Sequence, residues 1–350
     1  WPVNWLSRCA SMTYRFVNPR LKAWVSTIDR IGYTLTRWRK PRPFPAVVER
    51  ILLVKLTHLG DALALTPVLA QLAKRYPKAR LDVLVRPTAK ELMLLVPHGH
   101  TIWTMNPFEA PRGREKKVSW WRLLRTGLRL RRQRYNLVLE MRGDLRCALF
   151  CKCLGAEYLL GFSDGGGGFW YDRCLAPDPT LNFLARDAAI LTLLHPPISL
   201  ADPLSEAHLS IPSDAIIAVK RWLQSRELES GFVVVHTGTG RIKKDLTPQD
   251  LNRLDQRSSV LAGLPLVFTC AAGEYAKTVR FVKTWDRPYK TIILPTRSVT
   301  HLAAVVNAAQ HVVSADTLTM HLAGFLKKPL TALFKGESPT IWCPYPTSTL

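Results

Sequence analysis

The sequence lacks several features that would assign it to whole classes of protein. No apolar run reaches the roughly 18 residues needed to cross a bilayer, and no basic segment followed by an apolar core and a cleavage site marks a secretory signal. Acidic residues are also scarce, with 26 Asp and Glu against 49 Lys and Arg. The resulting net charge of +23 predicts an anionic partner, such as nucleic acid, phospholipid or a phosphorylated glycan.

Cysteine is present, but in no pattern that indicates disulfides or a zinc site. The seven cysteines are an odd number scattered through a long chain, which favours reduced thiols in a cytoplasmic compartment. Cys147, Cys151 and Cys153 lie close together but lack the paired Cys-x-x-Cys spacing and an obvious fourth ligand. We therefore expect packed helix cysteines and no bound metal. At 350 residues and 47% hydrophobic, the chain is long and apolar enough for two folded domains.

Residues 1–45 differ in character from the rest of the chain. A set of apolar residues recurs at spacings of four and three, which aligns them along one face of a helix. They are Trp24, Ile28, Ile31, Leu35 and Trp38. Nine basic residues and the single acid Asp29 accompany them, which suits a helix lying in an anionic membrane surface and equally a helix packed on the protein body. Prolines at positions 41, 43 and 45 predict a stiff linker that ends this extension.

From residue 46 the pattern alternates between strands and helices. Apolar runs of strand length are found first at residues 50–56, 80–86 and 135–141, separated by helical patterns such as residues 63–76. A second set begins at residue 231. Its predicted strands are residues 232–236, 264–270, 291–294, 311–315 and 330–334, and its predicted helices lie near residues 248–263, 274–285 and 298–309. The sequence therefore predicts an α/β protein with two Rossmann-like, doubly wound domains facing a cleft, connected through residues 196–212.

One carboxylate in the first set has a favourable position. The buried-looking run at residues 50–56 leads into the turn Leu59-Gly-Asp61. Open α/β proteins place their chemistry at such turns, where a parallel strand ends and a helix follows. Asp61 is therefore the first candidate for a catalytic group, with a plain helix N-cap as the alternative interpretation.

The second set carries two signals for phosphate binding. Residues 236–241 leave a strand directly, and their glycines permit backbone N–H groups to turn toward an anion, with Lys244 close behind. Asp316 and Thr317 open a helix after another strand, which offers unpaired N–H groups and the positive end of the helix dipole. His321 lies one turn further along. An ordinary turn with solvated lysines, an Asp N-cap and a core histidine are the alternatives.

Short signatures in a specific order and spacing extend across the chain. They are residues 51–55, Leu59-Gly-Asp61, Thr66-Pro67, residues 135–143, Gly155-Ala156, Gly161-Phe162, Asp316-Thr317, residues 320–323, residues 328–334 and residues 342–344. Taken together, they resemble glycosyltransferase family 9, the ADP-heptose lipopolysaccharide heptosyltransferases. The resemblance implies a GT-B fold, an inverting mechanism, and no metal or cofactor other than the substrate nucleotide sugar, ADP-heptose.

The resemblance also implies roles for individual residues. Asp61 would be the general base that takes a proton from the acceptor hydroxyl, while Lys244 and His321 would neutralise the departing diphosphate or assist it. The implied donor-binding residues are Thr239, Gly240, Lys244, Glu274, Asp316, Thr317, Leu318 and His321. The implied acceptor-binding residues are Lys55, Thr57, His58, Arg122 and Arg125. The family usually has glycine where Leu318 stands, so the donor as ADP-heptose follows from the family and not from this position.

A basic segment at residues 112–134 holds ten Lys or Arg against one acid, with Trp120, Trp121, Leu124 and Leu128 interleaved. It suits the phosphates and carboxylates of a lipid A core or an inner leaflet, although a solvated amphipathic helix fits as well. No recognised motif supports nucleic-acid binding. The glycine run at residues 165–168 lacks dinucleotide-binding spacing, so we expect a flexible loop near the acceptor.

These observations predict three regions: residues 1–45 as a basic amphipathic helical extension, residues 46–205 as the acceptor domain and residues 206–350 as the donor domain. The predicted protein is a cytoplasmic glycosyltransferase, peripheral on the inner membrane, that moves a heptose or related sugar from its nucleotide to a lipopolysaccharide core or lipid A precursor. Transfer to a protein hydroxyl is one alternative. A non-catalytic protein that binds anionic glycans or nucleic acid is another.

Overall fold

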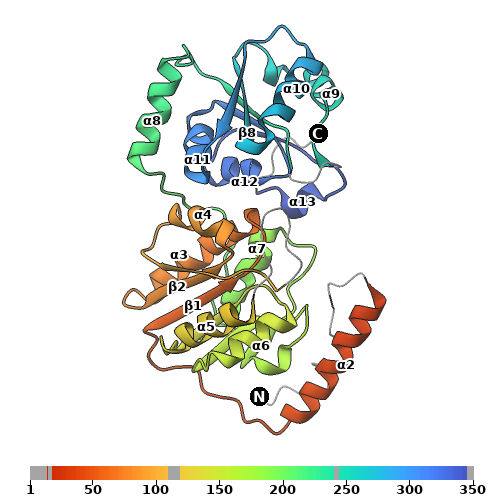
Figure 1. Ribbon diagram of the computed structural model, residues 1–350. Coiled ribbons are helices and arrows are strands. Elements are labelled where there is room, and N and C mark those ends of the chain that lie inside the picture. Colours follow the sequence, from red (N-terminus) through yellow and green to blue (C-terminus); the bar gives the residue numbers. More distant parts are fainter. Residues whose placement is uncertain (1–13, 15–17, 109–118, 240–243, 345–350) are drawn as a thin grey trace. The chain divides into compact units, whose positions relative to one another are not determined.

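The computed structural model describes residues 14, 18–108, 119–239 and 244–344, and the chain divides into two compact units (Figure 1). Unit 1 comprises Trp1–Lys90 and His98–Glu206, and unit 2 comprises Glu91–Pro97 and Ala207–Leu350. The chain first passes into unit 2 within the short helix α4 (Lys90–Leu94). No helix in the described part of the chain is both long and apolar enough to cross a membrane.

Unit 1 is built on a six-stranded, wholly parallel sheet with the order β3-β2-β1-β4-β5-β6. The strands are β1 (Arg50–Lys55), β2 (Arg80–Val85), β3 (Thr101–Thr104), β4 (Leu137–Glu140), β5 (Tyr158–Phe162) and β6 (Arg173–Leu175). β1 and β4 are buried on both faces, which explains their continuous apolar runs. The predicted set lacks β3, β5 and β6. Two of these, β3 and β6, are short and only half-buried, so their apolar signal is weak.

Helices and short 3₁₀ turns connect the strands of unit 1. They are η1 (Gly60–Ala64), α3 (Leu65–Arg75), η2 (Pro87–Ala89), α5 (Trp120–Arg131), α6 (Leu145–Cys153), η3 (Gly168–Trp170), α7 (Phe183–Ala188) and η4 (Ala189–Leu193). The helix predicted at residues 63–76 therefore begins two residues later, because a 3₁₀ turn precedes it. The predicted cysteine packing is seen in α6, where Cys147 and Cys151 are buried in the core while Cys153 is exposed.

Unit 2 contains a five-stranded parallel sheet with the order β11-β10-β7-β8-β9. Its strands are β7 (Val233–His236), β8 (Leu266–Ala271), β9 (Thr291–Thr296), β10 (His311–Ala315) and β11 (Leu330–Leu333). Its helices and turns are α8 (Ser213–Gln224), α9 (Pro248–Arg257), η6 (Ser259–Leu261), η7 (Ala272–Glu274), α10 (Tyr275–Trp285), α11 (Val299–Ala308), α12 (Leu318–Phe325) and α13 (Pro339–Trp342). The Thr247 N-cap, Pro248 and the reciprocal Asp250 capping box start α9, at the beginning of the helix predicted near residues 248–263.

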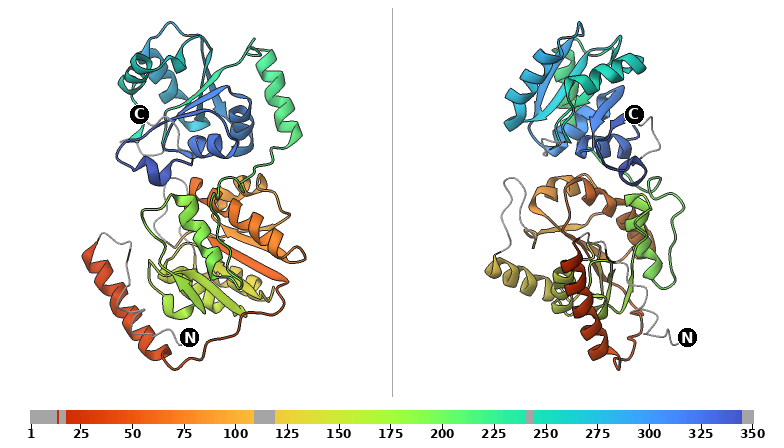
Figure 2. Two further views of the ribbon diagram at one scale, coloured as in Figure 1. Left: turned by 180° about the vertical axis from the view of Figure 1, so that it is seen from behind. Right: turned by 90° about the vertical axis from the view of Figure 1, so that its right-hand side faces the viewer.

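Helix α2 (Pro19–Thr36) runs along the outside of unit 1 (Figure 2). It packs through Val25, Asp29 and Gly32, which are its buried residues. Asp29 accepts hydrogen bonds from the Tyr14 hydroxyl and the Gly167 N–H, both at 2.8 Å. The predicted apolar face is not the packing face, because Trp24, Leu35 and Trp38 are 60%, 77% and 81% exposed. One face of this helix thus packs on the protein, as one of the two alternatives expects, and the other face is open to solvent.

The glycine run at residues 165–168 is the surface on which α2 packs. A Cβ added at Gly166 would lie 2.4 Å from Val25 Cγ1, and one at Gly168 would lie 2.3 Å from the Tyr33 hydroxyl. Gly166 and Gly167 also have left-handed backbones with φ of 89° and 85°. The run is buried, so the expected flexible loop is replaced by a close helix-packing site.

Candidate active site

Both sheets have the same switch in strand order. In unit 1 the order reverses between β1 and β4, and in unit 2, read from β9, it reverses between β7 and β10. Open parallel sheets bind ligands just beyond the carboxyl ends of the strands at such a switch point. The turns that follow β1, β4, β7 and β10 are therefore where chemistry is expected in this chain.

Asp61 lies in the turn that follows β1. It is the second residue of η1, whose N-cap is Leu59, so Asp61 does not cap α3 and the plain N-cap interpretation is wrong. Its carboxylate accepts a backbone hydrogen bond from His58, and the residue keeps partial exposure to solvent. Burial raises the pKa of Asp61, and the positive charges of Lys55, Arg86 and Arg142 act against that rise.

The three cations near Asp61 follow three adjacent strands. Lys55 ends β1, Arg86 comes directly after β2, and Arg142 comes two residues after β4. Arg86 donates to the Leu56 carbonyl at 3.2 Å, and Arg142 donates to the same carbonyl. Lys55 and Arg86 are 4% and 1% exposed. The edge of the sheet therefore surrounds one carboxylate with buried positive charge.

Lys55 has partners other than the predicted acceptor. Its ammonium group forms a buried ion pair with Asp187 of α7 and donates to the Met141 carbonyl at 3.2 Å. Burial raises the pKa of Asp187, Lys55 opposes that rise, and the nearby Asp61 charge adds to it. Lys55 thus interacts with two carboxylates, Asp61 and Asp187, and its positive charge offsets the repulsion between them.

Glu140, the last residue of β4, holds the turn that carries Arg142. It accepts hydrogen bonds from the N–H groups of Arg142 and Gly143, each at 2.9 Å, and from the Tyr171 hydroxyl at 2.8 Å. Gly143 has a φ of 63°, which a residue with a side chain rarely adopts. Burial raises the pKa of Glu140 to about 7.

The remaining predicted acceptor residues are more loosely placed. The Thr57 hydroxyl is buried and has no hydrogen-bond partner within the described ranges. His58 is exposed. Arg122 and Arg125 are also exposed, on α5. The structure therefore gives no fixed contact between these two arginines and Asp61.

In unit 2, Thr239 follows β7 and is held by its own loop. Its N–H and its hydroxyl both donate to Asp245 Oδ1, at 2.6 and 2.9 Å. The loop closes where the Leu246 N–H donates to the Thr237 carbonyl at 2.9 Å. Gly240, a predicted donor contact, lies outside the described residues.

Glu274 reaches the same turn from the neighbouring strand. It ends η7, which follows β8, and a Cβ placed on Gly238 would lie 3.4 Å from both of its carboxylate oxygens. Thr237, Gly238 and Glu274 line one small cavity. A carboxylate beside the phosphate-type turn suits the hydroxyls of a ribose.

The turn after β10 opens α12. Thr317 is the N-cap and its hydroxyl accepts from the Thr319 N–H at 3.3 Å, so the N-cap is Thr317 and not Asp316. Leu318 is the first residue of the helix. His321 is buried, which lowers its pKa to about 4, so its imidazole is neutral at pH 7. A neutral imidazole can still donate a hydrogen bond from its one N–H group.

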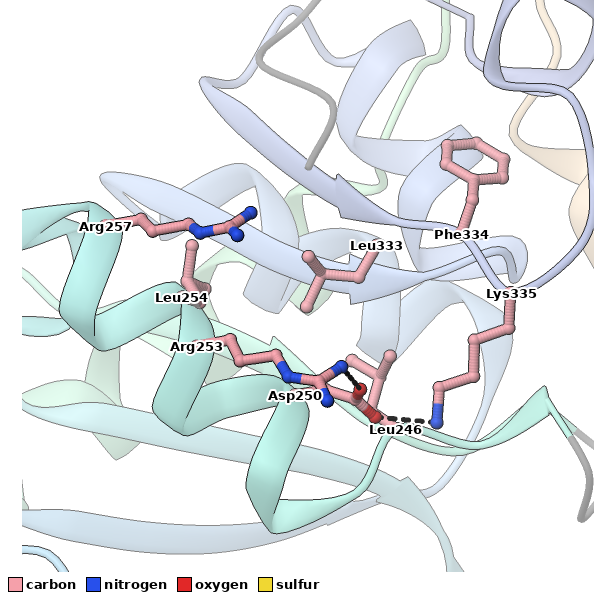
Figure 3. A pocket seen from close by; sticks show the side chains of 8 residues that line it. All are labelled: Leu246, Asp250, Arg253, Leu254, Arg257, Leu333, Phe334 and Lys335. Carbon is pink, nitrogen blue, oxygen red and sulfur yellow. Dashed lines mark ion pairs between the residues drawn. The ribbon is translucent and has the colours of Figure 1, made fainter.

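Lys244 and Lys335 are both engaged by acids. Lys244 forms an ion pair with Glu337, and Lys335 bonds Asp250 Oδ2 at 2.6 Å. Figure 3 shows Asp250 between Lys335 and Arg253 at the side of a cavity of about 270 Å³, next to the end of β11. In the structure each lysine is thus paired with a carboxylate of unit 2.

Sequence reasoning missed Arg86, Arg142 and Asp187. The first two had a usable signal, since each is the first basic residue after a buried strand. Asp187 had none, because it comes from α7, far along the chain from Lys55.

Comparison with known proteins identifies the family. The model of glycosyltransferase family 9 (heptosyltransferase) matches residues 122–349. The chain belongs to this family. It is 23% identical over 301 residues to lipopolysaccharide heptosyltransferase 3 of Escherichia coli K12, covering 83% of each chain. It is also 23% identical to lipopolysaccharide heptosyltransferase 1 of Pseudomonas aeruginosa, over 83% of this chain and 79% of that one.

Solved structures agree on the fold. The family 9 glycosyltransferase of Veillonella parvula matches with a TM-score of 0.68 at 16% identity, covering 86% of this chain and 85% of that one. Escherichia coli ADP-heptose lipopolysaccharide heptosyltransferase II matches with a TM-score of 0.65 at 15% identity, over 86% and 90%. The predicted GT-B class is confirmed, and the protein is a glycosyltransferase.

Proposed function

We propose that this glycosyltransferase moves a heptose from ADP-heptose to the core of a lipopolysaccharide acceptor, with inversion at the anomeric carbon. The names of its relatives support the sugar and the acceptor class. The single observation that carries the mechanism is Asp61, a partly exposed carboxylate with a raised pKa at the switch point of unit 1.

In the proposed reaction, an acceptor hydroxyl oxygen attacks the anomeric carbon of the donor while Asp61 takes its proton. The bond from that carbon to the diphosphate oxygen breaks, and the electron pair leaves with the nucleoside diphosphate. A carboxylate whose pKa lies above its ordinary value is a better proton acceptor, and the cations around Asp61 limit how far burial raises that pKa.

Unit 2 supplies the donor site in this proposal. The turns after β7 and β10 present the Thr239 and Thr317 hydroxyls and the amino end of α12 to the diphosphate. The Glu274 carboxylate accepts hydrogen bonds from the ribose hydroxyls, and the Lys244 ammonium group provides positive charge. We propose that these groups replace a metal ion in stabilising the leaving group, so a chelator leaves the rate unchanged.

The proposed site of action is the cytoplasmic face of the inner membrane. The exposed Trp24 and Leu35 of α2, the exposed Trp38 just after it, and the exposed Trp120 and Trp121 of α5 support it. Tryptophan beside arginine is typical of segments that rest on anionic lipid surfaces.

Replacing the base tests the mechanism. Asp61→Ala should lower kcat by about 10²- to 10⁴-fold, the range for removal of a general base, with donor binding nearly intact. Asp214→Ala, at an exposed acid in the first turn of α8, is the matched control and should retain full activity. Transfer would be followed by mass spectrometry of the acceptor with ADP-heptose as donor. A variant at Asp61 that still transfers at the normal rate would refute the base assignment.

The donor can be identified separately from catalysis. Among nucleotide sugars, the ADP-linked heptose should raise the melting temperature most, since ligands that bind the native state stabilise it. Product anomeric configuration, measured by NMR, reports inversion or retention. Transfer to a protein hydroxyl, with none to a lipopolysaccharide core, would replace the proposed acceptor.

A further inference from the structure

An apolar groove lies between helices α5 and α6 of unit 1. We name it the α5–α6 groove and define it by Trp120, Leu124 and Leu128 on α5 and by Leu149 and Phe150 on α6. Its volume is about 630 Å³, within the range of roughly 300–1,000 Å³ found for small-molecule sites. The relatives' names and the proposed mechanism assign it no role.

Helix α5 has a glycine where it lines the groove. Gly127 lies in the interior of α5 and lines the groove. A Cβ there would come within 3.4 Å of Phe150 Cε2, an ordinary contact, so a larger residue fits the backbone but would occupy the space. Glycine is a poor helix former, which makes its presence unfavourable for the helix alone.

The apolar lining is unusually open to solvent. Trp120 is 84% exposed, and Leu124, Leu128 and Leu149 are about half exposed, at 54%, 49% and 47%. Clustered exposed apolar side chains of this kind mark a surface that meets another apolar phase.

The charge around the groove indicates an anionic occupant. Helix α5 carries four arginines and no acidic residue. Arg131 lines one end of the groove, where it donates to the Cys153 carbonyl at 3.3 Å, and Arg146 lines the other, where it donates to the Phe108 carbonyl at 3.0 Å. The same positive charge disfavours a second copy of this chain as the occupant, because like charges would face each other.

The groove is also linked to the candidate active site. Arg146 bonds Asp144 at 2.9 Å, and Asp144 lies 4.0 Å from Arg142, one of the cations around Asp61. A molecule held at the Arg146 end therefore lies next to the charge network of the catalytic edge.

We propose that the α5–α6 groove binds one acyl chain of an anionic bilayer phospholipid, with Arg146 or Arg131 contacting its phosphate. This inference rests on the proposed membrane site of action. Binding a single chain at this point would hold the enzyme on the bilayer with Arg146, and through it the catalytic edge, at the level of the lipid head groups.

Myristoyl lysophosphatidylglycerol, used below its micellar concentration, is a suitable probe. It should bind saturably to the full-length protein in calorimetry and should slow the reaction of the exposed Cys153 with N-ethylmaleimide, measured by peptide mass mapping. Gly127→Leu should fill the groove and weaken binding by about tenfold or more. Gly127→Ala is the matched control and should bind normally, because a methyl group leaves most of the groove open.

Further arms separate the possible sources of the ligand. The phosphatidylcholine analogue with the same chain should bind more weakly, since its head group has no net charge. Equal binding of Gly127→Leu and Gly127→Ala would overturn the proposal. So would protection of Cys153 by an acylated lipid A acceptor but not by the phospholipid. Transfer to a soluble, deacylated acceptor should be the same in both glycine variants, and its absence in the unmodified protein would count against the proposed function instead.

Discussion

The carboxyl edges of the two sheets share a strand order but differ in their charge. In unit 1 the turns at the switch point bring together ionisable side chains: Asp61, Lys55, Arg142 and, from α7, Asp187. In unit 2 the corresponding turns bring hydroxyls, a helix amino end and neutral histidines together with the ion pair of Lys244 and Glu337. One topology thus supports two different sets of polar groups, because the turns after the strands determine the chemistry and the strands determine only where it occurs.

The difference matches two tasks in one transfer reaction. A general base needs a carboxylate with a raised proton affinity, and burial raises the pKa of Asp61 while nearby cations limit that rise. A leaving diphosphate instead needs fixed hydrogen-bond donors that keep their protons, which neutral hydroxyls and the amino end of α12 provide. His321 belongs to the second group because burial keeps it neutral.

Replacing Lys55, the cation that pairs with Asp187 in unit 1, should have the largest effect on stability. Lys55→Met leaves Asp187 buried without its partner, and breaking a buried ion pair in this way costs about 3–5 kcal/mol. The double variant Lys55→Met/Asp187→Leu should recover much of that loss, since apolar replacement of both partners is often neutral. Urea unfolding measures the free energy of unfolding of the single and the double variant. Equal stabilities for the single variant and the unmodified protein would show that the pair contributes nothing to unit 1.

Acid should affect the two units in opposite directions. Burial lowers the pKa of His236 and His321 to about 4, so unit 2 loses stability as pH falls from about 6.5 to about 4, by up to about 3 kcal/mol per histidine. Burial raises the pKa of Glu140 to about 7, so unit 1 gains stability as pH falls from about 7 to about 4.5.

Peptide-resolved hydrogen exchange, corrected for the intrinsic pH dependence of exchange, would follow each unit separately. Protection of β10 and α12 should fall on mild acidification while that of β4 holds or rises. His321→Phe serves as the control and should remove part of the loss in unit 2. If acid changed the hydrogen-exchange protection of both units in the same direction, the predicted difference between them would be wrong.

Substituting Asp61 should also reveal how much the burial of its carboxylate destabilises the native protein. Because its folded-state pKa is raised, the ionised form is less stable in the native protein than in the unfolded chain. Asp61→Asn should therefore raise the melting temperature modestly at neutral pH while it abolishes transfer, and the gain should shrink as pH falls through the native pKa. Differential scanning calorimetry across that range checks it. A lower melting temperature at neutral pH would mean that the surrounding cations outweigh burial.

Local signals in the sequence predicted much of this arrangement. The apolar runs of β1 and β10 and the polar residues directly after them placed Asp61 and Thr317 at sheet edges, because strand and turn are read from adjacent residues. The capping box of α9 was predictable for the same reason. The ion pair of Lys55 with Asp187 was not, since it joins segments that only the folded chain brings together.

The orientation of α2 shows a second limit of prediction from sequence. Hydrophobic spacing selected the face with Trp24 and Leu35, whereas the helix packs through Val25, Asp29 and Gly32. Small residues allow the backbone to approach the glycine run closely, and periodicity of hydrophobicity carries no information about such an approach.

The smallest expected effects come from two helix glycines of unit 1 that should respond with opposite sign. A Cβ at Gly32 of α2 would lie 2.4 Å from the Phe169 ring, so Gly32→Ala should destabilise the packing of α2 by about 1–3 kcal/mol. At Gly127 of α5 the nearest atom is 3.4 Å away, so Gly127→Ala should stabilise by about 0.5–1 kcal/mol through helix propensity alone. Urea unfolding, with proteolysis of α2 as a local probe, compares them. Stabilisation by both substitutions would mean that α2 gains nothing from its close contact, and its exposed Trp24 would then belong to a helix free to leave the protein surface.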